Sequence, residues 1–184
     1  MSPQEVVESV GIPAHISPHA TLGFHGTDAQ HVPGICGEGF TSARCRLGLF
    51  GRGPYFYEDN APNPGLDAAL DFVNFRRNFP TPTVLCADVS LERAFDMIGF
   101  SSNQSLFNEL QKKLVDLATS QDPHAVIDDR KIGSATITFI SRHCPEASGM
   151  QGVRAEFSMK NLPQPRQNGL CVLDCGCIQN VRQC

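Results

Sequence analysis

Two short segments in the first third of the chain combine residue types that can hold a flat ring bearing an amide. His25 and Gly26 end a short apolar run, and Tyr55 follows a turn that contains Gly51 and Gly53. A glycine directly after a strand lets the backbone approach a ligand, because it has no Cβ. A tyrosine stacked on a flat ring contributes about 0.5 to 1.5 kcal/mol beyond the burial of area. The two segments together indicate a binding site.

Each of these residues has a structural explanation when it is taken alone. A single histidine after a strand is usually satisfied within the fold, and a tyrosine in an apolar strand usually belongs to the core. Tyr57 lies on the same face of its strand as Tyr55, so it is predicted to line the edge of the pocket. A ligand site is favoured because several motifs occur together and in order.

The order of these motifs resembles the NAD-binding half of the poly(ADP-ribose) polymerase superfamily, with the diphtheria-toxin-like arrangement of histidine and tyrosine. L-G-F-H-G-T at 22–27 is followed by G-I-C-G-E-G-F at 34–40 and L-F-G-R-G-P-Y-F-Y at 49–57. Residues 83–95 look like the family's next strand, and 168–179 look like its last motif strand. The resemblance covers roughly two thirds of the chain, most strongly the first half.

The resemblance implies that NAD is the co-substrate and gives each motif residue a role. His25 is expected to hydrogen-bond a ribose hydroxyl, Gly26 to hold the carboxamide through its backbone, and Tyr55 to stack on nicotinamide. Phe72 is expected to lie on the other side of the same ring. The further positions expected to bind the dinucleotide are Thr27, Arg44, Gly53, Tyr57, Ala69 and Gly169.

Two positions depart from the family's pattern. Catalytically strong members open the last motif strand with a glutamate, which stabilises the positive charge that develops as nicotinamide leaves. That position falls on Gly169 or on Cys171, depending on the alignment. Glu156 on the preceding predicted strand is the candidate catalytic acid, although a solvated strand residue explains it equally well. Ala69 stands where the family has a carboxamide-binding serine, so backbone contacts alone are expected to hold the carboxamide.

The resemblance therefore implies NAD-dependent mono-ADP-ribosyltransfer. One ADP-ribose unit would move to a protein or nucleic-acid acceptor, a protein being favoured, with release of nicotinamide. Polymer synthesis is not expected, because it needs an acid to activate the hydroxyl of an acceptor sugar. The alternatives are an NAD glycohydrolase and a degenerate domain that binds NAD, ADP-ribose or a partner without turnover. The sequence does not separate them, because they use the same residues.

The elements that position these residues are expected to form an α+β domain. The resemblance implies a split, mostly antiparallel β-sheet core with a few flanking helices. Strands are predicted at 21–25, 55–57, 83–90, 135–140, 152–159 and 169–174, and helices at 4–10, 66–79 and 104–119. A further short helix is predicted between its N-cap Asp28 and Gly37 or Gly39.

The domain organisation follows from the extent of the motifs. Residues 1–20 are predicted to be a leader, and 21–184 a single domain of the ADP-ribosyltransferase type. Within it, 96–150 matches nothing in the family and is predicted to be a divergent insertion or a lid over the NAD cleft. In the strand at 152–159, apolar and polar side chains alternate, so one face is predicted to be core and the other polar.

Composition excludes some partners and compartments. The chain has 184 residues and a formal charge of -4 with no basic stripe, so duplex nucleic-acid binding is not expected. It shows no signal peptide and no apolar run that could span a membrane, so cytoplasm or nucleus is expected, with secretion as an effector as the alternative. The eight cysteines are predicted to be free and mostly buried. No metal site is expected, because the last four lack paired C-x2-C spacing.

Overall fold

The structure, a computed structural model, describes residues 3–59, 64–77, 79–124, 126–158 and 166–184. It confirms the predicted α+β class and the mostly antiparallel sheet, which has six strands and is accompanied by a two-stranded hairpin. The helices are α1 (Pro3–Val10), α2 (Val32–Glu38), α3 (Gly65–Asp71), α4 (Ser101–Gln121) and α5 (Asp129–His143), with a π-helix η3 (Phe72–Arg77) directly after α3. The strands are β1 (Ile16–Asp28), β2 (Leu47–Gly48), β3 (Gly51–Arg52), β4 (Tyr55–Glu58), β5 (Pro82–Asp96), β6 (Gly152–Ser158), β7 (Arg166–Val172) and β8 (Ile178–Gln183). The short 3-10 turns are η1 (Ala29–His31), η2 (Ser42–Arg44), η4 (Pro145–Ala147) and η5 (Cys175–Cys177).

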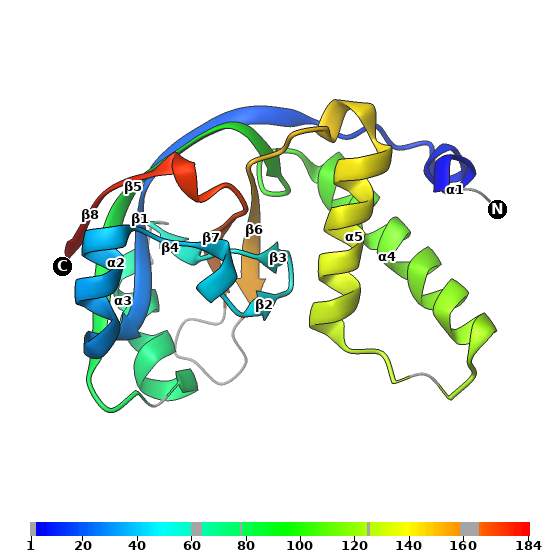
Figure 1. The fold of residues 1–184 in the computed structure, drawn as a ribbon. Coiled ribbons are helices and arrows are strands. Elements are labelled where there is room, and N and C mark those ends of the chain that lie inside the picture. Colours follow the sequence, from blue (N-terminus) through cyan, green and yellow to red (C-terminus); the bar gives the residue numbers. More distant parts are fainter. Residues whose placement is uncertain (1–2, 60–63, 78, 125, 159–165) are drawn as a thin grey trace.

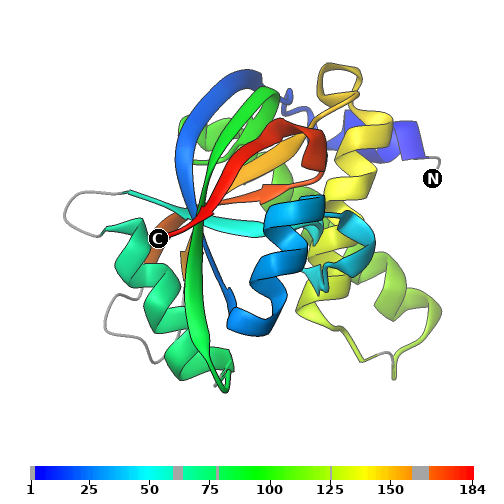
Figure 2. The same cartoon turned by 60° about the vertical axis from the view of Figure 1, so that its left-hand side comes forward.

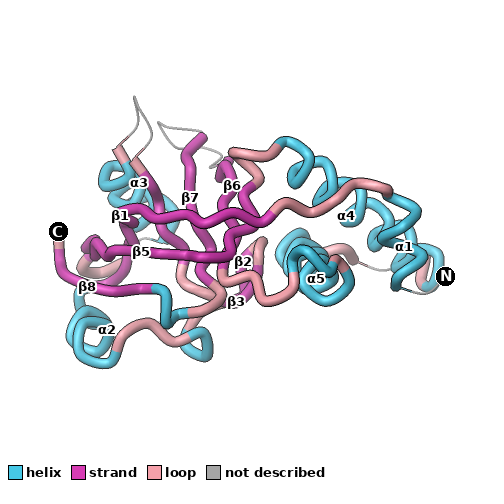
Figure 3. The backbone as a smooth tube through the Cα atoms, turned by 90° about the horizontal axis from the view of Figure 1, so that it is seen from above, coloured by secondary structure: helices cyan, strands magenta, loops and turns pink. Residues whose placement is uncertain are grey.

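The two longest strands, β1 and β5, form the backbone of the sheet. They run side by side, from the pair of Ile16 with Phe95 to the pair of Asp28 with Pro82 (Figures 1 and 3). The sheet order is β1-β4-β7-β6-β5-β8, and β1 also pairs with β5. The pairings therefore close a ring through β1, β4, β7, β6 and β5, while β8 pairs with β5 outside it.

An apolar cluster, here called the inner cluster, fills part of this ring. It joins side chains of β5 to side chains of β4 and β7, which do not pair with β5, so it lies between the strands. Gly23 on β1 makes room for it, because a Cβ at Gly23 would lie 2.9 Å from Cβ of Phe56. The buried members of the inner cluster are Phe56, Ala87, Val89, Leu91, Ala94, Leu170, Val172 and Cys177.

The rest of the ring interior is polar and centres on Glu58 at the end of β4, whose side chain is 3% exposed. Oε2 of Glu58 accepts from Nε of Arg154 at 2.8 Å, and Oε1 lies 2.5 Å from Nε2 of His19. Nη1 of Arg154 also lies 3.2 Å from Oδ2 of Asp96, and Nε2 of Gln167 donates to the Glu58 carbonyl. This Glu58 network connects β1, β4, β5, β6 and β7.

The outer face of β5, β6 and β7 is covered by α1, α4, α5 and the β2–β3 hairpin, which lie on one side of the sheet (Figures 1 and 2). The segment 96–150, predicted to be an insertion or lid, thus supplies two helices to a core. Residues of the predicted leader also pack there, among them Val6, Val7 and Val10. The buried members of this helix cluster are Ala14, Phe50, Phe95, Met97, Leu106, Phe107, Leu110, Ile137, Ile140, Cys144, Ala147, Met150, Val153, Ala155 and Cys171.

The strand predicted at 135–140 is wrong, because this segment belongs to α5. Its run of threonine and isoleucine favours a strand when it is taken alone. Asp128 caps the helix instead, accepting from the backbone N–H groups of Arg130 and Lys131. Tertiary packing decides the outcome, because the buried residues recur at the spacing of a helix face. They are Gly133, Thr136, Ile137 and Ile140.

Most other predicted elements are confirmed, with changed bounds. The helices at 4–10, 66–79 and 104–119 are present, the second partly as η3 and with residue 78 outside the described residues. Asp28 caps η1, and α2 ends at Gly39, whose φ is 79°. Strand β8 was not predicted. The polar face predicted for 152–159 is corrected in one respect, because Arg154 lies inside the ring, whereas Glu156 is exposed as expected. Residue 159 lies outside the described residues.

The eight cysteines are free, as predicted, but only half of them are buried. Cys86, Cys144, Cys171 and Cys177 are buried, whereas Cys36 and Cys184 are exposed. Burial raises the pKa of Cys144 to about 11, with a smaller contribution from the charge of Glu146. This thiol is therefore protonated at neutral pH.

The Glu58 network is expected to dominate the stability of the fold. Replacing Glu58 with alanine leaves the Arg154 charge in the ring without its closest carboxylate, which should lower the free energy of unfolding by about 3 to 5 kcal/mol. Urea denaturation at pH 7 measures this loss. The control is Glu156→Ala, which removes an exposed ion pair with Arg166 at 3.6 Å. It should cost at most about 1 kcal/mol.

The difference between wild type and Glu58→Ala should also depend on pH. Burial raises the pKa of Glu58, but the hydrogen bonds and charges of His19 and Arg154 outweigh it and hold the pKa below 4.5. The carboxylate therefore contributes stability above pH 4.5, which is lost as the pH falls through its folded-state pKa. A difference that stays constant from pH 7 to about pH 3 would contradict this account.

Candidate functional site

The candidate site lies where β1 and β4 part. Among the described residues, their ladder ends at the pair of Phe24 with Tyr57. One step further along β1, Nδ1 of His25 lies 2.8 Å from the carbonyl oxygen of Tyr55. Because a carbonyl only accepts, Nδ1 carries the proton and donates, which leaves Nε2 as an acceptor. Beyond the last pair of the ladder, a hydrogen bond from the His25 side chain to the backbone of β4 thus connects the two strands.

The surroundings of His25 keep its ring neutral. The half-buried imidazole contacts Phe40 edge-on at 5.0 Å between ring centroids and Phe56 at 5.6 Å. Burial lowers the pKa of His25, the hydrogen bond to the Tyr55 carbonyl opposes this, and the positive charge of Arg77 lowers the pKa further. A neutral imidazole with a free lone pair on Nε2 can accept a hydrogen bond from a hydroxyl group.

Gly26 faces helix α3 and the π-helix that follows it. A Cβ at Gly26 would lie 2.4 Å from Cγ1 of Val73 and 2.8 Å from the carbonyl oxygen of Ala69. Ala68 and Ala69 are small and fully buried, which lets the helix pack directly onto the strand. Val73 and the Ala69 carbonyl therefore fill the space in front of the Gly26 backbone, so a ring can enter there only if α3 and η3 move outward.

The same side of β1 gathers two aromatic rings and a cation. The half-buried Phe72 lies 6.1 Å from the buried ring of Tyr57. The guanidinium carbon of Arg77 lies 5.3 Å from the centroid of the Phe72 ring, and its charge also acts on His25. The sequence analysis did not include Arg77 among the site residues. The available signal in the sequence was its place five residues after Phe72, about one helical turn further along the same predicted helix.

The side chain of Tyr55 makes different contacts. Its hydroxyl accepts from the backbone N–H of Phe50 at 2.9 Å and lies 3.4 Å from the carbonyl of Gly51, to which it donates. Its ring lies 5.6 Å from that of Phe157. Burial is the main reason that the pKa of Tyr55 is raised, so the hydroxyl stays protonated. Tyr55 therefore ties the β2–β3 hairpin to the sheet.

The structure does not bring the Tyr55 ring to the His25 imidazole. Successive side chains of a strand point to opposite faces. Phe56 contacts His25 inside the ring of strands, so Tyr55 and Tyr57 point outward, toward Phe157. The prediction that Tyr55 and Tyr57 share a face is confirmed. His25 contacts the backbone of Tyr55, and Gly26 faces Val73 and Ala69 on the α3 side.

Neither position aligned with the family's glutamate can hold an acid in this fold. A Cβ at Gly169 would lie 2.0 Å from Cε2 of Phe157 and 2.7 Å from the carbonyl oxygen of Phe56. Cys171 is fully buried in the helix cluster, where burial raises the pKa of its thiol to about 12. The packing of β7 therefore leaves no room for a side chain at Gly169 and keeps Cys171 in the core.

The candidate acid Glu156 lies apart from His25. Its carboxylate is half exposed and faces Arg166, and strands β4 and β7 separate its strand from β1. The last residue of β4, Glu58, is a buried acid that was not predicted as a site residue. The available signal was alternation, since Glu58 follows Phe56 by two residues and therefore shares its inner face.

The remaining predicted positions have mainly structural contacts. Thr27 is buried on β1. Arg44 is exposed and forms an ion pair with Glu38 at 2.8 Å. A Cβ at Gly53 would lie 1.9 Å from the carbonyl oxygen of Val172, so Gly53 lets the chain before β4 pass close to β7.

No protein-family model matches the sequence, and no curated protein matches it. The described helices include none that is both long and apolar enough to span a membrane.

The protonation state of His25 gives a direct test of the site. We expect histidine NMR resonances of the folded protein to include one with a pKa below 6.5, absent from a His25→Gln variant. Because the unfolded state then binds a proton more readily than the folded state, His25 should reduce stability as the pH falls below 6.5. A His25 resonance that titrates at or above this value would contradict the neutral, donating Nδ1.

The hairpin contact of Tyr55 makes a separate prediction. Tyr55→Phe keeps the ring in the core but removes both hydrogen bonds of the hydroxyl, which should lower the free energy of unfolding by about 1 to 3 kcal/mol. Amide exchange should accelerate at Phe50, whose N–H loses its acceptor. The Leu85 amide in β5 provides an internal reference. Unchanged exchange at Phe50 would show that the hydroxyl does not hold the hairpin.

Proposed function

We propose that the protein transfers a single ADP-ribose unit from NAD to an acceptor, a protein being favoured, and releases nicotinamide. The observation that carries this proposal is the geometry at His25 and Gly26. There β1 parts from β4, a neutral imidazole keeps an acceptor nitrogen, and Phe72 and Arg77 lie on the adjoining helix. The edge of β1 thus has an acceptor nitrogen on its inner face and an aromatic ring with a cation on the side of Gly26, and these groups suit a dinucleotide with an amide-bearing base.

Each part of NAD has a partner in this proposal. Nε2 of His25 accepts a ribose hydroxyl, and the backbone of Gly26 holds the carboxamide, since Ala69 offers no side-chain hydrogen bond. Phe72 stacks on the nicotinamide, and Arg77 neutralises charge on the pyrophosphate. Val73 and the Ala69 carbonyl must move away from Gly26 for the ring to enter, which requires an outward shift of α3 and η3.

The transfer step breaks the bond between the ribose C1′ and the nicotinamide nitrogen. Nicotinamide leaves neutral, with the bonding electron pair, and the acceptor nucleophile forms the new bond to C1′ and loses its proton. The positive charge on the sugar in the transition state calls for nearby negative charge. Gly169 and Cys171 supply none, so the reaction is expected to be slow and to stop after one unit.

The same observation favours a second candidate function. Because the close contact of Gly169 with Phe157 excludes an acid at that position, the domain can also be a binder of NAD or ADP-ribose without turnover. An NAD glycohydrolase, in which water replaces the acceptor, uses the same contacts. The three functions differ only in the fate of NAD.

Incubation with NAD labelled on its adenosine half tests the proposal. We expect label on an acceptor or on the protein itself, and we expect His25→Ala to reduce it at least about tenfold, because the hydrogen bond to the ribose is lost. The matched control is His31→Ala, on an exposed turn just after β1. Tyr55→Ala is unsuitable, because it removes a core ring together with the hairpin contact.

The products distinguish the alternatives. Release of nicotinamide with no attached label indicates hydrolysis. NAD binding by calorimetry that His25→Ala weakens, without release of nicotinamide over hours, indicates a binding domain. Absence of NAD binding at about 1 mM would overturn all three functions.

A further inference from the structure

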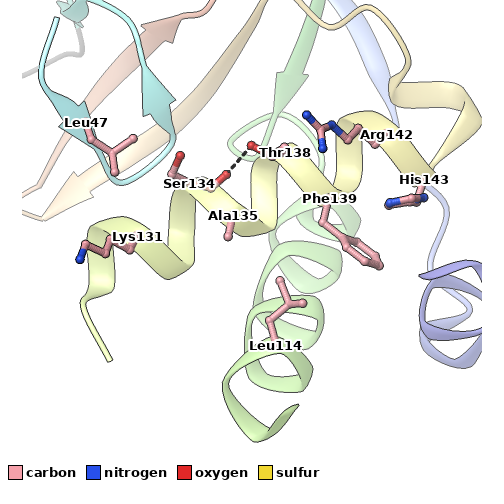
Figure 4. A pocket seen from close by; sticks show the side chains of 9 residues that line it. All are labelled: Leu47, Leu114, Lys131, Ser134, Ala135, Thr138, Phe139, Arg142 and His143. Atoms are coloured by element: carbon pink, nitrogen blue, oxygen red, sulfur yellow. Dashed lines mark hydrogen bonds between the residues drawn. The ribbon is translucent and has the colours of Figure 1, made fainter. Parts of the chain in front are cut away.

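A groove runs along α5, bordered by Leu47 of the β2–β3 hairpin on one side and by Leu114 of α4 on the other (Figure 4). It consists of two adjoining pockets of about 420 and 280 Å³. The two share Leu47 from the hairpin and three residues of α5, so they form one continuous surface. The shared residues of α5 are Ser134, Thr138 and Arg142.

The lining of this groove carries positive charge at both ends. Lys131 lies at one end of the α5 face, Arg142 and His143 lie at the other, and Arg52 is on the hairpin side. No aspartate or glutamate lines either pocket, although the chain as a whole has a formal charge of -4. The groove is therefore cationic on an acidic protein.

Two of these cations are not used by the described part of the fold. The side chains of Lys131 and Arg142 are exposed and make no hydrogen bond or ion pair with the described residues. Arg142 lies in the last turn of α5, where the helix dipole favours a cation. Lys131 lies in the first turn, where the dipole disfavours one. The charge of Lys131 acts on the carboxylate of the N-cap Asp128, but its side chain forms no ion pair there.

Between its charged ends the groove is largely apolar. Leu47, Leu114, Ala135 and Phe139 contribute to the surface. The hydroxyl of Thr138 is already engaged, since it donates to the carbonyl of Ser134 at 2.9 Å. The groove thus offers apolar contact in the middle and cations at the ends.

Charge and dimensions favour one occupant. The α5 axis rises about 16 Å between Lys131 and Arg142, which an extended peptide of about five residues spans. Alternating side chains of such a peptide would place acidic groups toward the cations and apolar groups toward Leu47 and Phe139. Single-stranded nucleic acid is less suited, because it binds through several aromatic platforms. Here two phenylalanines line the groove: Phe139 is already in contact with the His143 ring at 4.7 Å, and Phe50 is buried in the core.

We infer that this groove binds an extended, acidic and partly apolar segment of a partner protein. The inference does not depend on ADP-ribosyltransfer, because none of the groove residues belongs to the site at His25. It does depend on the hairpin, which supplies Leu47 and Arg52 and which the Tyr55 hydroxyl holds in place.

Fluorescence anisotropy with a labelled peptide of about ten residues, in which glutamate alternates with leucine, tests this inference. The full chain should bind it, and a peptide with glutamine in place of glutamate should bind at least about tenfold more weakly. Lys131→Glu combined with Arg142→Glu should weaken the binding of the acidic peptide by about tenfold to a hundredfold. The control is Lys112→Glu, an exposed lysine of α4 outside the groove. Circular dichroism of each variant confirms that it folds.

Three results would overturn the inference. The first is no binding of the acidic peptide at about 1 mM. The second is an equal loss of affinity in Lys112→Glu and in the double variant, which would indicate a general effect of charge. The third is tighter binding of a single-stranded oligodeoxythymidine than of the acidic peptide, with the same dependence on Lys131 and Arg142, which would assign the groove to nucleic acid.

Discussion

The arrangement of the strands depends on one buried carboxylate. Transferring a charged group from water into a protein interior costs several kcal/mol, so Glu58 is stable inside the ring only when it is paired. Its partners come from two other strands, His19 from β1 and Arg154 from β6. A slip of one residue would turn Phe56 and Glu58 to the opposite face, and it would separate the Glu58 carboxylate from both of its partners. The network therefore fixes the register of the ring.

The inward direction of Glu58 determines where the motif side chains lie. Since Glu58 and Phe56 share the inner face of β4, Tyr55 and Tyr57 must point outward. His25 faces Phe56 inside the ring, and the Tyr55 hydroxyl holds the β2–β3 hairpin outside it. Strand β4 thus contacts both surfaces: its backbone binds His25 next to Gly26, and its Tyr55 side chain holds the hairpin that borders the cationic groove along α5.

The sequence predicts what depends on local patterns and misses what depends on distant partners. The α+β class, helix α4 and the core face of β6 follow from periodicity, and each is present. The strand predicted at 135–140 fails because its β-branched residues pack against a hairpin some ninety positions earlier in the chain, and Gly133 would meet Leu49 at 2.5 Å if it had a Cβ. The polar partner of Arg154 could not be predicted for the same reason, since Glu58 is 96 residues away in the chain.

The motif glycines show how this fold constrains the proposed function. The resemblance to the ADP-ribosyltransferase family implies that a ligand approaches the backbone of Gly26. In this structure, Val73 and the Ala69 carbonyl occupy that space. Exposing a buried valine costs about 1.5 to 3 kcal/mol. An intrinsic micromolar affinity for NAD would then be reduced to about ten to a few hundred micromolar, since the binding-competent state is populated in proportion. Millimolar NAD would still fill such a site. The packing of η3 on Gly26 would therefore lower the affinity for NAD without preventing its binding. Within α3–η3, the π-helix is the irregular part, and such segments occur often at functional sites.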